Sequence, residues 1–152
     1  MTETTGKLRP AVPADAAQLQ DIAKAAYALY LPRMDRPPAP MLADYAALIH
    51  EGQVSVLEAG GALVGFLVAF PRAADYFVEN VAVSPACQGA GHGRFLMAAA
   101  EDAARAAGRD TLRLYTNEAM TENLAFYESI GYVVEERRLE DGYRRIFFTK
   151  RL

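Results

Sequence analysis

Three glycines at alternate positions, Gly89, Gly91 and Gly93, follow a Val-rich apolar run that ends at Ser84. An Ala-rich pattern with helical periodicity begins directly after them, at about Arg94. A loop without side chains lets a ligand approach the backbone closely. The free N–H groups and the positive dipole at the start of a helix attract anions, above all phosphates. The order of strand, glycine-rich loop and helix therefore predicts a phosphate-binding site.

The spacing of these glycines excludes two common phosphate loops. A dinucleotide fingerprint needs Gly-x-Gly-x-x-Gly, and counting from Gly89 its last position is Arg94. A Walker A loop ends in Gly-Lys-Ser or Gly-Lys-Thr, whereas Gly93 is followed by Arg94. The pattern that remains is Gln88, two residues, Gly91, one residue and Gly93.

A second segment with candidate chemistry runs from Asn117 to Tyr132 and contains the pair Phe126-Tyr127. Its pattern predicts a helix, on which Asn123 and Tyr127 share one face because they are four residues apart. An amide and a phenol on one helix face can contact the same ligand.

Together the two segments resemble the GNAT superfamily of N-acetyltransferases. The pyrophosphate loop of that family usually reads Arg or Gln, two residues, Gly, one residue, then Gly or Ala, and it follows the fourth strand. Gln88, Gly91 and Gly93 match this pattern directly after a predicted strand. The resemblance covers roughly residues 7–150.

The family also often carries Asn-x-x-Ala-x-x-Phe-Tyr, then Gly-Phe or Gly-Tyr a few residues later. The matching pairs here are Phe126-Tyr127 and Gly131-Tyr132. The chain departs from the pattern at Met120, where the family often has Asn, and at Asn123, which stands in the usual Ala place. We expect Asn123 to take over the cofactor contact.

The resemblance implies acetyl-CoA as cosubstrate, with its diphosphate on the glycine-rich loop and its pantetheine arm along the preceding strand. The residues assigned to it are Val81, Ala82, Val83, Gln88, Gly89, Ala90, Gly91, His92, Gly93, Arg94, Asn117 and Asn123. Arg94 suits a phosphate contact or a solvated helix start about equally. For His92 we expect a solvent-facing place in the loop rather than a catalytic role.

Tyr127 is the candidate general acid. In the resembled family a tyrosine here lies near the cofactor sulfur, and aminolysis of a thioester expels a thiolate. A phenol of pKa about 10 can give its proton to that leaving group. The alternative is a core tyrosine, because Phe126, Tyr127 and Ile130 are spaced to share the packed side of a helix.

Glu79 is the candidate general base, because an attacking amine must be neutral and a nearby carboxylate can accept its proton. Strand alternation places it on one face with Phe77, Val81 and Val83. A carboxylate on such an apolar face is unusual and suggests a functional site. The alternative is a solvated glutamate.

The acceptor amine is expected to bind at a Pro-rich segment, residues 27–38, which in the resembled fold lies over the acceptor end of the cleft. Tyr27 and Tyr30 would contact the acceptor, and Arg33 and Arg36 would grip a carboxylate on it. The alternative is a surface loop held rigid by its prolines.

Composition limits the class of protein. The 152 residues, 52% of them hydrophobic, suit one domain with one core, assigned to residues 1–152. A net charge of −3 without a basic stripe argues against nucleic acid as a partner. Apolar runs are too short to cross a membrane, and residues 1–7 lack a leader pattern. With the single cysteine, Cys87, these features indicate a cytoplasmic protein.

The pattern of elements predicts an α/β (α+β) fold, a GNAT-like mixed, partly antiparallel sheet of about six to seven strands flanked by about four helices. The expected strands are residues 7–9, 53–59, 62–71, 75–84, 111–116, 132–139 and 143–150. The expected helices are residues 14–29, 41–50, 93–107 and 121–130. Residues 31–40 contain four prolines and are expected to lack regular structure.

These features predict an N-acetyltransferase that moves an acetyl group from acetyl-CoA to a primary amine of a small molecule or peptide by direct attack. No activated nucleophile for a covalent intermediate is visible, and no His, Cys, Asp or Glu cluster has metal-ligand spacing. A homodimer is compatible with this interpretation. Two alternatives are a non-catalytic acyl-CoA-binding sensor or scaffold, favoured by Met120, and a plain interaction domain that binds no CoA.

Overall fold

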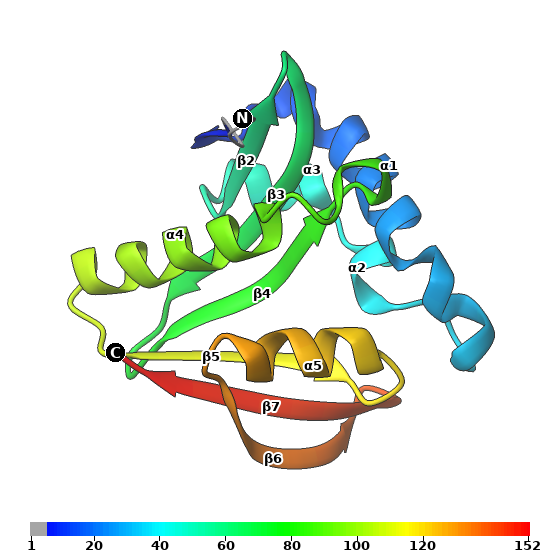
Figure 1. Ribbon diagram of the computed structural model, residues 1–152, viewed down its shortest axis with the longest axis vertical. Coiled ribbons are helices and arrows are strands. Elements are labelled where there is room, and N and C mark those ends of the chain that lie inside the picture. Colours follow the sequence, from blue (N-terminus) through cyan, green and yellow to red (C-terminus); the bar gives the residue numbers. More distant parts are fainter. Residues whose placement is uncertain (1–5) are drawn as a thin grey trace.

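A computed structural model describes residues 6–152 of the chain (Figure 1). Residues 1–5, which form most of the segment inspected for a leader, lie outside the described residues. Within residues 6–152 one sheet contains seven strands in the order β1-β2-β3-β4-β5-β7-β6. The strands are β1 (Lys7–Pro10), β2 (Val54–Ala59), β3 (Ala62–Pro71), β4 (Tyr76–Val83), β5 (Thr111–Asn117), β6 (Val133–Glu140) and β7 (Tyr143–Arg151). Within the described residues, β4 and β5 are the parallel pair and the other neighbours are antiparallel.

Five α-helices accompany the sheet in residues 6–152, and they confirm the predicted mixed fold. They are α1 (Ala16–Tyr27), α2 (Ala39–Leu42), α3 (Tyr45–His50), α4 (His92–Ala106) and α5 (Thr121–Ser129). Three 3₁₀ turns, η1 (Pro13–Asp15), η2 (Ala28–Arg33) and η3 (Pro85–Cys87), lie before or after helices. The predicted strands match the observed ones to within one or two residues at each end.

The helical predictions differ from the structure around the prolines. The single helix expected at residues 41–50 is two helices, α2 and α3, because Asp44 caps α3 by accepting a hydrogen bond from the Ala47 N–H (3.1 Å). The segment expected to be irregular, residues 31–40, holds the end of η2 and the start of α2. The first helix begins later than expected, at Ala16, after the turn η1.

Helices pack on both faces of the sheet (Figure 1). On one face α4 contributes Leu96 and Met97 to a core that includes Leu112 of β5 and Phe148 of β7. On the other face α1 and α3 pack on the amino-terminal strands, and Phe66 of β3 lies in that core. The two cores therefore lie on opposite faces of a single sheet.

The sheet opens at a β-bulge in β4. Asn80 pairs with Val68 of β3, and Val78 pairs with Ala69, so Glu79 has no partner on β3. Pairing of β4 with β5 covers Tyr76 to Val78 and stops there. Beyond that point the two strands diverge, as Figure 1 shows.

The prediction that Glu79 shares one strand face with Phe77 and Val81 is wrong, because of this bulge. Val78 and Val81 both pack into the core under α4, although side chains three apart in a regular strand face opposite sides. Phe77 instead contacts Tyr115 on the other side of the sheet, with ring centroids 5.7 Å apart. Phe77 and Val81 therefore do not share a face, because the extra residue, Glu79, reverses the alternation.

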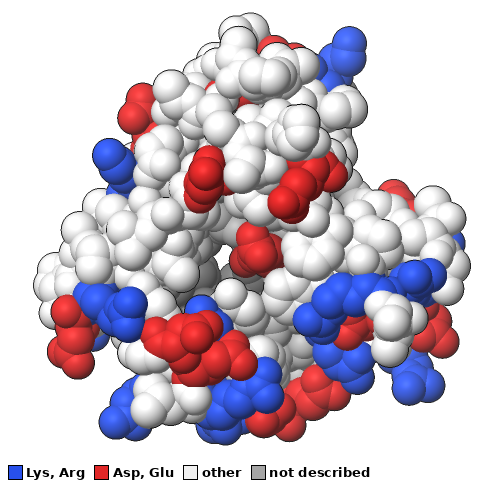
Figure 2. All heavy atoms as spheres, turned by 180° about the vertical axis from the view of Figure 1, so that it is seen from behind, with Lys and Arg blue, Asp and Glu red and all other residues white. Residues whose placement is uncertain are grey.

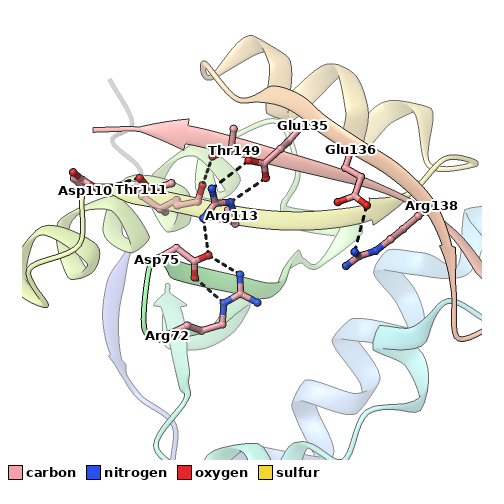
Figure 3. Close-up of polar contacts among 10 residues, drawn as sticks. Arg72, Asp75, Asp110, Thr111, Arg113, Glu135, Glu136, Arg138 and Thr149 are labelled. Atoms are coloured by element: carbon pink, nitrogen blue, oxygen red, sulfur yellow. Dashed lines mark hydrogen bonds and ion pairs between the residues drawn. The ribbon is translucent and has the colours of Figure 1, made fainter.

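A network of ion pairs ties the strands together at the end where β4 and β5 are still paired (Figure 3). Arg72 donates from Nε and Nη2 to the two carboxylate oxygens of Asp75, each at 2.7 Å. Arg113 of β5 donates from Nη1 to Asp75 Oδ2 (3.0 Å) and from Nε and Nη2 to Glu135 of β6 (3.0 and 3.2 Å). These arginines hold the pKa of the buried Asp75 carboxyl below its usual range.

We predict that Asp75→Asn lowers the free energy of unfolding by about 1–3 kcal/mol at pH 7. The variant keeps the shape but removes a buried charge that two arginines share, although both arginines are exposed enough to regain water. Because the folded-state pKa of Asp75 is lowered, its stabilisation is present above the unfolded value of about 3.9 and is lost as pH falls through the folded value.

Urea unfolding of both proteins at pH 7 and at about pH 3 measures this effect. The difference between them should shrink at the lower pH. The control is Asp102→Asn, which removes the 81%-exposed partner of Arg105 and should change stability by less than about 0.5 kcal/mol. Equal stabilities of the Asp75 variant and the parent at pH 7 would contradict the role given to the network.

Candidate functional site

The glycine-rich loop connects β4 to α4 in a conformation that needs its glycines. Gly89 and Gly91 have φ of 88° and 85°, in the left-handed region that side chains disfavour. Gly91 is the N-cap of α4. The Gln88 side chain braces the loop, because its Nε2 donates to the Val83 carbonyl oxygen (3.2 Å). Gly93 is less constrained, since a Cβ there would make a van der Waals contact with the Phe126 ring at 3.4 Å.

A long groove of about 570 Å³ runs past this loop. Its lining comes from α1 and η2, from β4 and the loop, and from α5: Ala26, Tyr27, Leu29, Tyr30, Val81, Ala82, Val83, Gln88, Gly89, Gly91, His92, Gly93, Arg94, Glu122, Asn123, Phe126 and Tyr127. The structure thus brings most of the residues assigned to the cofactor to one groove. Of that set, Ala90 and Asn117 are not part of its lining, and Asn117 lines a neighbouring cavity instead.

His92 does not face solvent as expected. It is the first residue of α4 and is 6% exposed, with its Nδ1 buried and without a hydrogen-bond partner in residues 6–152. No sequence signal indicated this burial, because a residue between two glycines has no periodic pattern that shows which way its side chain points. Arg94 is exposed at the groove, and its Nη2 lies 3.4 Å from the Ser129 hydroxyl.

A smaller inner cavity of about 200 Å³ lies on the other side of the point where β4 and β5 part. Its lining is Tyr27, Met34, Ala39, Pro40, Ala43, Leu48, Val78, Glu79, Asn80, Val81, Tyr115, Thr116, Asn117, Met120, Asn123, Tyr127, Tyr143 and Arg145. From behind, the molecule is hollowed near its centre, and acidic side chains stand beside the opening (Figure 2).

The long groove and the inner cavity meet at a shared wall. Tyr27, Val81, Asn123 and Tyr127 line both of them. A ligand in the groove and a second ligand in the cavity would therefore contact the same four side chains.

Tyr127 belongs both to the core and to this shared wall. Its ring packs against Phe126, Tyr132 and Phe148, with centroids 5.3, 6.0 and 5.8 Å away. Its hydroxyl forms no hydrogen bond with any other residue that the structure describes. Burial raises the pKa of this phenol, so it is protonated at neutral pH and can act only as a proton donor there.

Glu79 lines the inner cavity from the bulge and is half-buried. Burial raises the pKa of its carboxyl, and the charge of Glu51 raises it further. A carboxylate with a raised pKa is a better proton acceptor than a fully solvated one, because its basicity lies nearer to neutral pH.

A buried chain of hydrogen bonds fixes the shared wall. The Tyr27 hydroxyl donates to Asn80 Oδ1 (2.8 Å) and approaches the Val81 carbonyl oxygen (3.2 Å). Asn80 Nδ2 donates in turn to the Tyr45 hydroxyl of α3 (2.9 Å). Asn80 and Tyr45 were not predicted as site residues, although an asparagine in a Val-rich strand is a signal that could have indicated a buried polar contact.

Of the predicted acceptor residues, Tyr27 lines the inner cavity, whereas Arg33 and Arg36 contact other parts of the protein. Arg33 pairs with Glu122 of α5 (2.7 and 3.0 Å), and Arg36 donates to the Asp141 carbonyl oxygen (2.9 Å). Neither arginine lines the inner cavity. Tyr30 lines the long groove, and its hydroxyl lies 3.5 Å from Asn123 Oδ1.

The cation that does line the inner cavity is Arg145 of β7, which sequence reasoning missed. An arginine between Tyr143 and Phe147 on a strand was the available signal. Met120, where the family often has Asn, is 4% exposed, and its sulfur lies 3.6 Å from Asn123 Nδ2. Within residues 6–152 no group of three His, Cys, Asp or Glu side chains is placed to hold a metal ion. No helix in this part of the chain is long and apolar enough to cross a membrane.

Comparisons with known proteins agree with this geometry. A family model described as an acetyltransferase (GNAT) domain matches residues 50–134. A comparison with curated protein sequences found no match.

Three solved structures illustrate the structural likeness. The PaiA N-acetyltransferase of Thermoplasma acidophilum, in complex with coenzyme A, is 18% identical with a TM-score of 0.82, over 97% of this chain and 99% of that one. A GCN5-related N-acetyltransferase of Rhodopseudomonas palustris is 25% identical with a TM-score of 0.79, over 100% and 99%. The Salmonella typhimurium protein YncA, with its cofactor acetyl-CoA, is 22% identical with a TM-score of 0.70, over 97% and 94%.

Proposed function

Because the chain belongs to the GNAT acetyltransferase family, we propose that it transfers an acetyl group from acetyl-CoA to a primary amine of a small molecule or peptide by direct attack. One observation carries the proposal. The long groove and the inner cavity share Tyr27, Val81, Asn123 and Tyr127, so a donor in one and an acceptor in the other would meet there.

The long groove fits acetyl-CoA in size and chemistry. Its volume, about 570 Å³, lies in the range of small-molecule sites. The first N–H groups of α4 and the loop backbone at Gly89 and Gly91 form the kind of anion site that a diphosphate needs. Structural neighbours that hold coenzyme A or acetyl-CoA support this assignment. Bound acetyl-CoA would supply the thioester carbonyl that the amine attacks.

The roles of the side chains follow from their places. Glu79 in the inner cavity accepts a proton from the acceptor amine, directly or through water, as the C–N bond forms. Tyr127 on the shared wall donates its hydroxyl proton to the sulfur as the C–S bond breaks. The chain Tyr27–Asn80–Tyr45 holds the bulged strand in position.

The glycine-rich loop generates the first prediction. Gly91→Val should weaken CoA binding at least tenfold, because valine strains the left-handed conformation and moves the backbone donors. Calorimetry with CoA measures it. Gly108→Val is the matched control, since Gly108 has a φ of 74° and open space around it at the far end of α4. Unchanged affinity in a folded Gly91→Val protein would remove the phosphate-loop assignment.

The second prediction concerns the general acid. Tyr127→Phe should lower kcat about tenfold or more and leave the CoA dissociation constant nearly unchanged, because only the proton donor is lost. Thiol release with a panel of primary amines gives the rates. The control is Tyr132→Phe, whose hydroxyl is also without a described partner but lines neither the groove nor the cavity. Equal losses in both variants, or none in either, would make Tyr127 a packing residue.

The third prediction concerns the general base. Without Glu79 the acceptor must lose its proton before it binds, so in Glu79→Gln the rise of kcat/KM with pH should move towards the pKa of the amine, up to about 10. Activity at pH 7 should fall more than activity at pH 10.

Glu51→Gln refines this test. It removes one cause of the raised Glu79 pKa, so the acidic limb of the profile should move to lower pH while activity on the plateau is kept. The measurement is kcat/KM of the parent and both variants from about pH 6 to 10. Superimposable profiles for the parent and Glu79→Gln would assign the proton to water instead.

A further inference from the structure

The inner cavity contains one side chain that neither its packing nor the proposed chemistry accounts for. Arg145 is 8% exposed, and its guanidinium lies over the Tyr115 ring at 4.1 Å. Its Nη1 donates to Glu140 and lies 3.4 Å from Asp141 Oδ2. These contacts fix the side chain but use one of its three nitrogens.

The other two nitrogens of Arg145 are unused. Neither Nε nor Nη2 forms a hydrogen bond with another residue that the structure describes. The buried side-chain polar atoms without partners in residues 6–152 are His92 Nδ1 and Tyr132 Oη, so Nε and Nη2 of Arg145 remain accessible. Arg145 lines the inner cavity, so a ligand there lies within reach of this side chain.

Two other arginines show what this edge of the guanidinium binds. Arg72 and Arg113 each use Nε and Nη2 together, and each grips both oxygens of one carboxylate, Asp75 and Glu135 respectively (Figure 3). The distances are 2.7 Å for both contacts of Arg72, and 3.0 and 3.2 Å for Arg113. The planar fork of arginine matches a carboxylate in this way. In Arg145 the same edge has no partner among residues 6–152.

The other residues that line the cavity indicate the chemistry of the rest of the ligand. The other charged residue in the lining is Glu79, the residue assigned to the amine. Met34, Pro40 and Leu48 make one wall apolar, which suits a short hydrocarbon spacer. The volume of about 200 Å³ limits the ligand to a small molecule.

We propose that the acceptor is a small amine that carries a carboxylate, and that Arg145 binds this carboxylate through Nε and Nη2. This rests on the proposed N-acetyltransferase function and names its substrate class. Arg145 thereby takes the role that the sequence suggested for Arg33 and Arg36, which are engaged with Glu122 and Asp141.

The test is a series of aminocarboxylates from glycine to 6-aminohexanoate, with leucine and methionine, each beside its own carboxamide. Thiol release from acetyl-CoA gives kcat/KM for each member. We expect the best carboxylate to exceed its amide at least tenfold. Arg145→Gln should abolish that preference by raising KM for the carboxylate at least tenfold more than KM for its amide, and Arg145→Lys should restore it only in part.

The matched control is Arg138→Gln. Arg138 also lies over an aromatic ring, Phe147, at 4.2 Å, and also pairs with Glu140, at 3.1 Å, but it does not line the inner cavity. Its loss should leave the preference for carboxylates intact. Equal effects of the two substitutions would mean that Arg145 acts through Glu140 and the fold, which would overturn the proposal.

Calorimetry of the best carboxylate with the protein saturated by CoA keeps the inference separate from the proposed function. Binding that needs Arg145, without acetylation of any amine, would refute the transferase while supporting the carboxylate site. Turnover of carboxylates and amides at equal kcat/KM, or a preference for diamines, would overturn the inference and leave the transferase standing. If the protein neither binds the carboxylate nor prefers carboxylates over amides, the inference is also overturned.

Discussion

Glu79 has no partner on β3, and one residue before it β4 makes its last pair with β5. The rest of the site depends on this interruption, because two strands that stayed paired would leave no passage between the faces of the sheet. The bulge also reverses the alternation of side chains in β4. Asn80 consequently lies towards α1 and α3, where Tyr27 and Tyr45 bond to it, while Val81 packs under α4. A break in one ladder thus sets the wall that the groove and the cavity share.

The divergence of β4 and β5 removes backbone hydrogen bonds from the sheet, so side-chain contacts must hold the strands together where they are still paired. Asp75, Arg72, Arg113 and Glu135 supply it by linking the start of β4 to β5 and β6. The Tyr115 ring of β5 also contacts Phe77 of β4 and Phe147 of β7, with ring centroids 5.7 and 5.4 Å away. Ion pairs and ring contacts therefore join the strands at one end, and the cavity forms at the other end, where the strands diverge.

The sequence was sufficient for features that local chemistry determines. The glycine-rich loop, the hairpins and most strand bounds follow from turn residues and from period-two or helical patterns, and the structure has them where they were expected. Features that depend on distant partners were missed. Nothing near Glu79 in the chain reveals that β3 pairs around it, and the engagement of Arg33 depends on Glu122, far away in sequence. Arg145 was overlooked for the same reason, because its proposed role depends on a cavity that other elements of the chain enclose.

The groove and the inner cavity depend to different extents on segments outside residues 50–134. The loop and the β4 backbone along the groove lie within residues 50–134, the stretch that the family model matches. The inner cavity takes Met34, Pro40 and Leu48 from before that stretch, and Tyr143 and Arg145 from after it. The groove also takes Ala26, Tyr27, Leu29 and Tyr30 from before that stretch. Substitutions near Met34, Leu48 and Arg145 can nevertheless reshape the cavity and leave the loop and the β4 backbone unchanged. Under the proposed function, variation in these two short segments changes the acceptor while the site for the acyl donor is kept, both in evolution and in the engineering of selectivity.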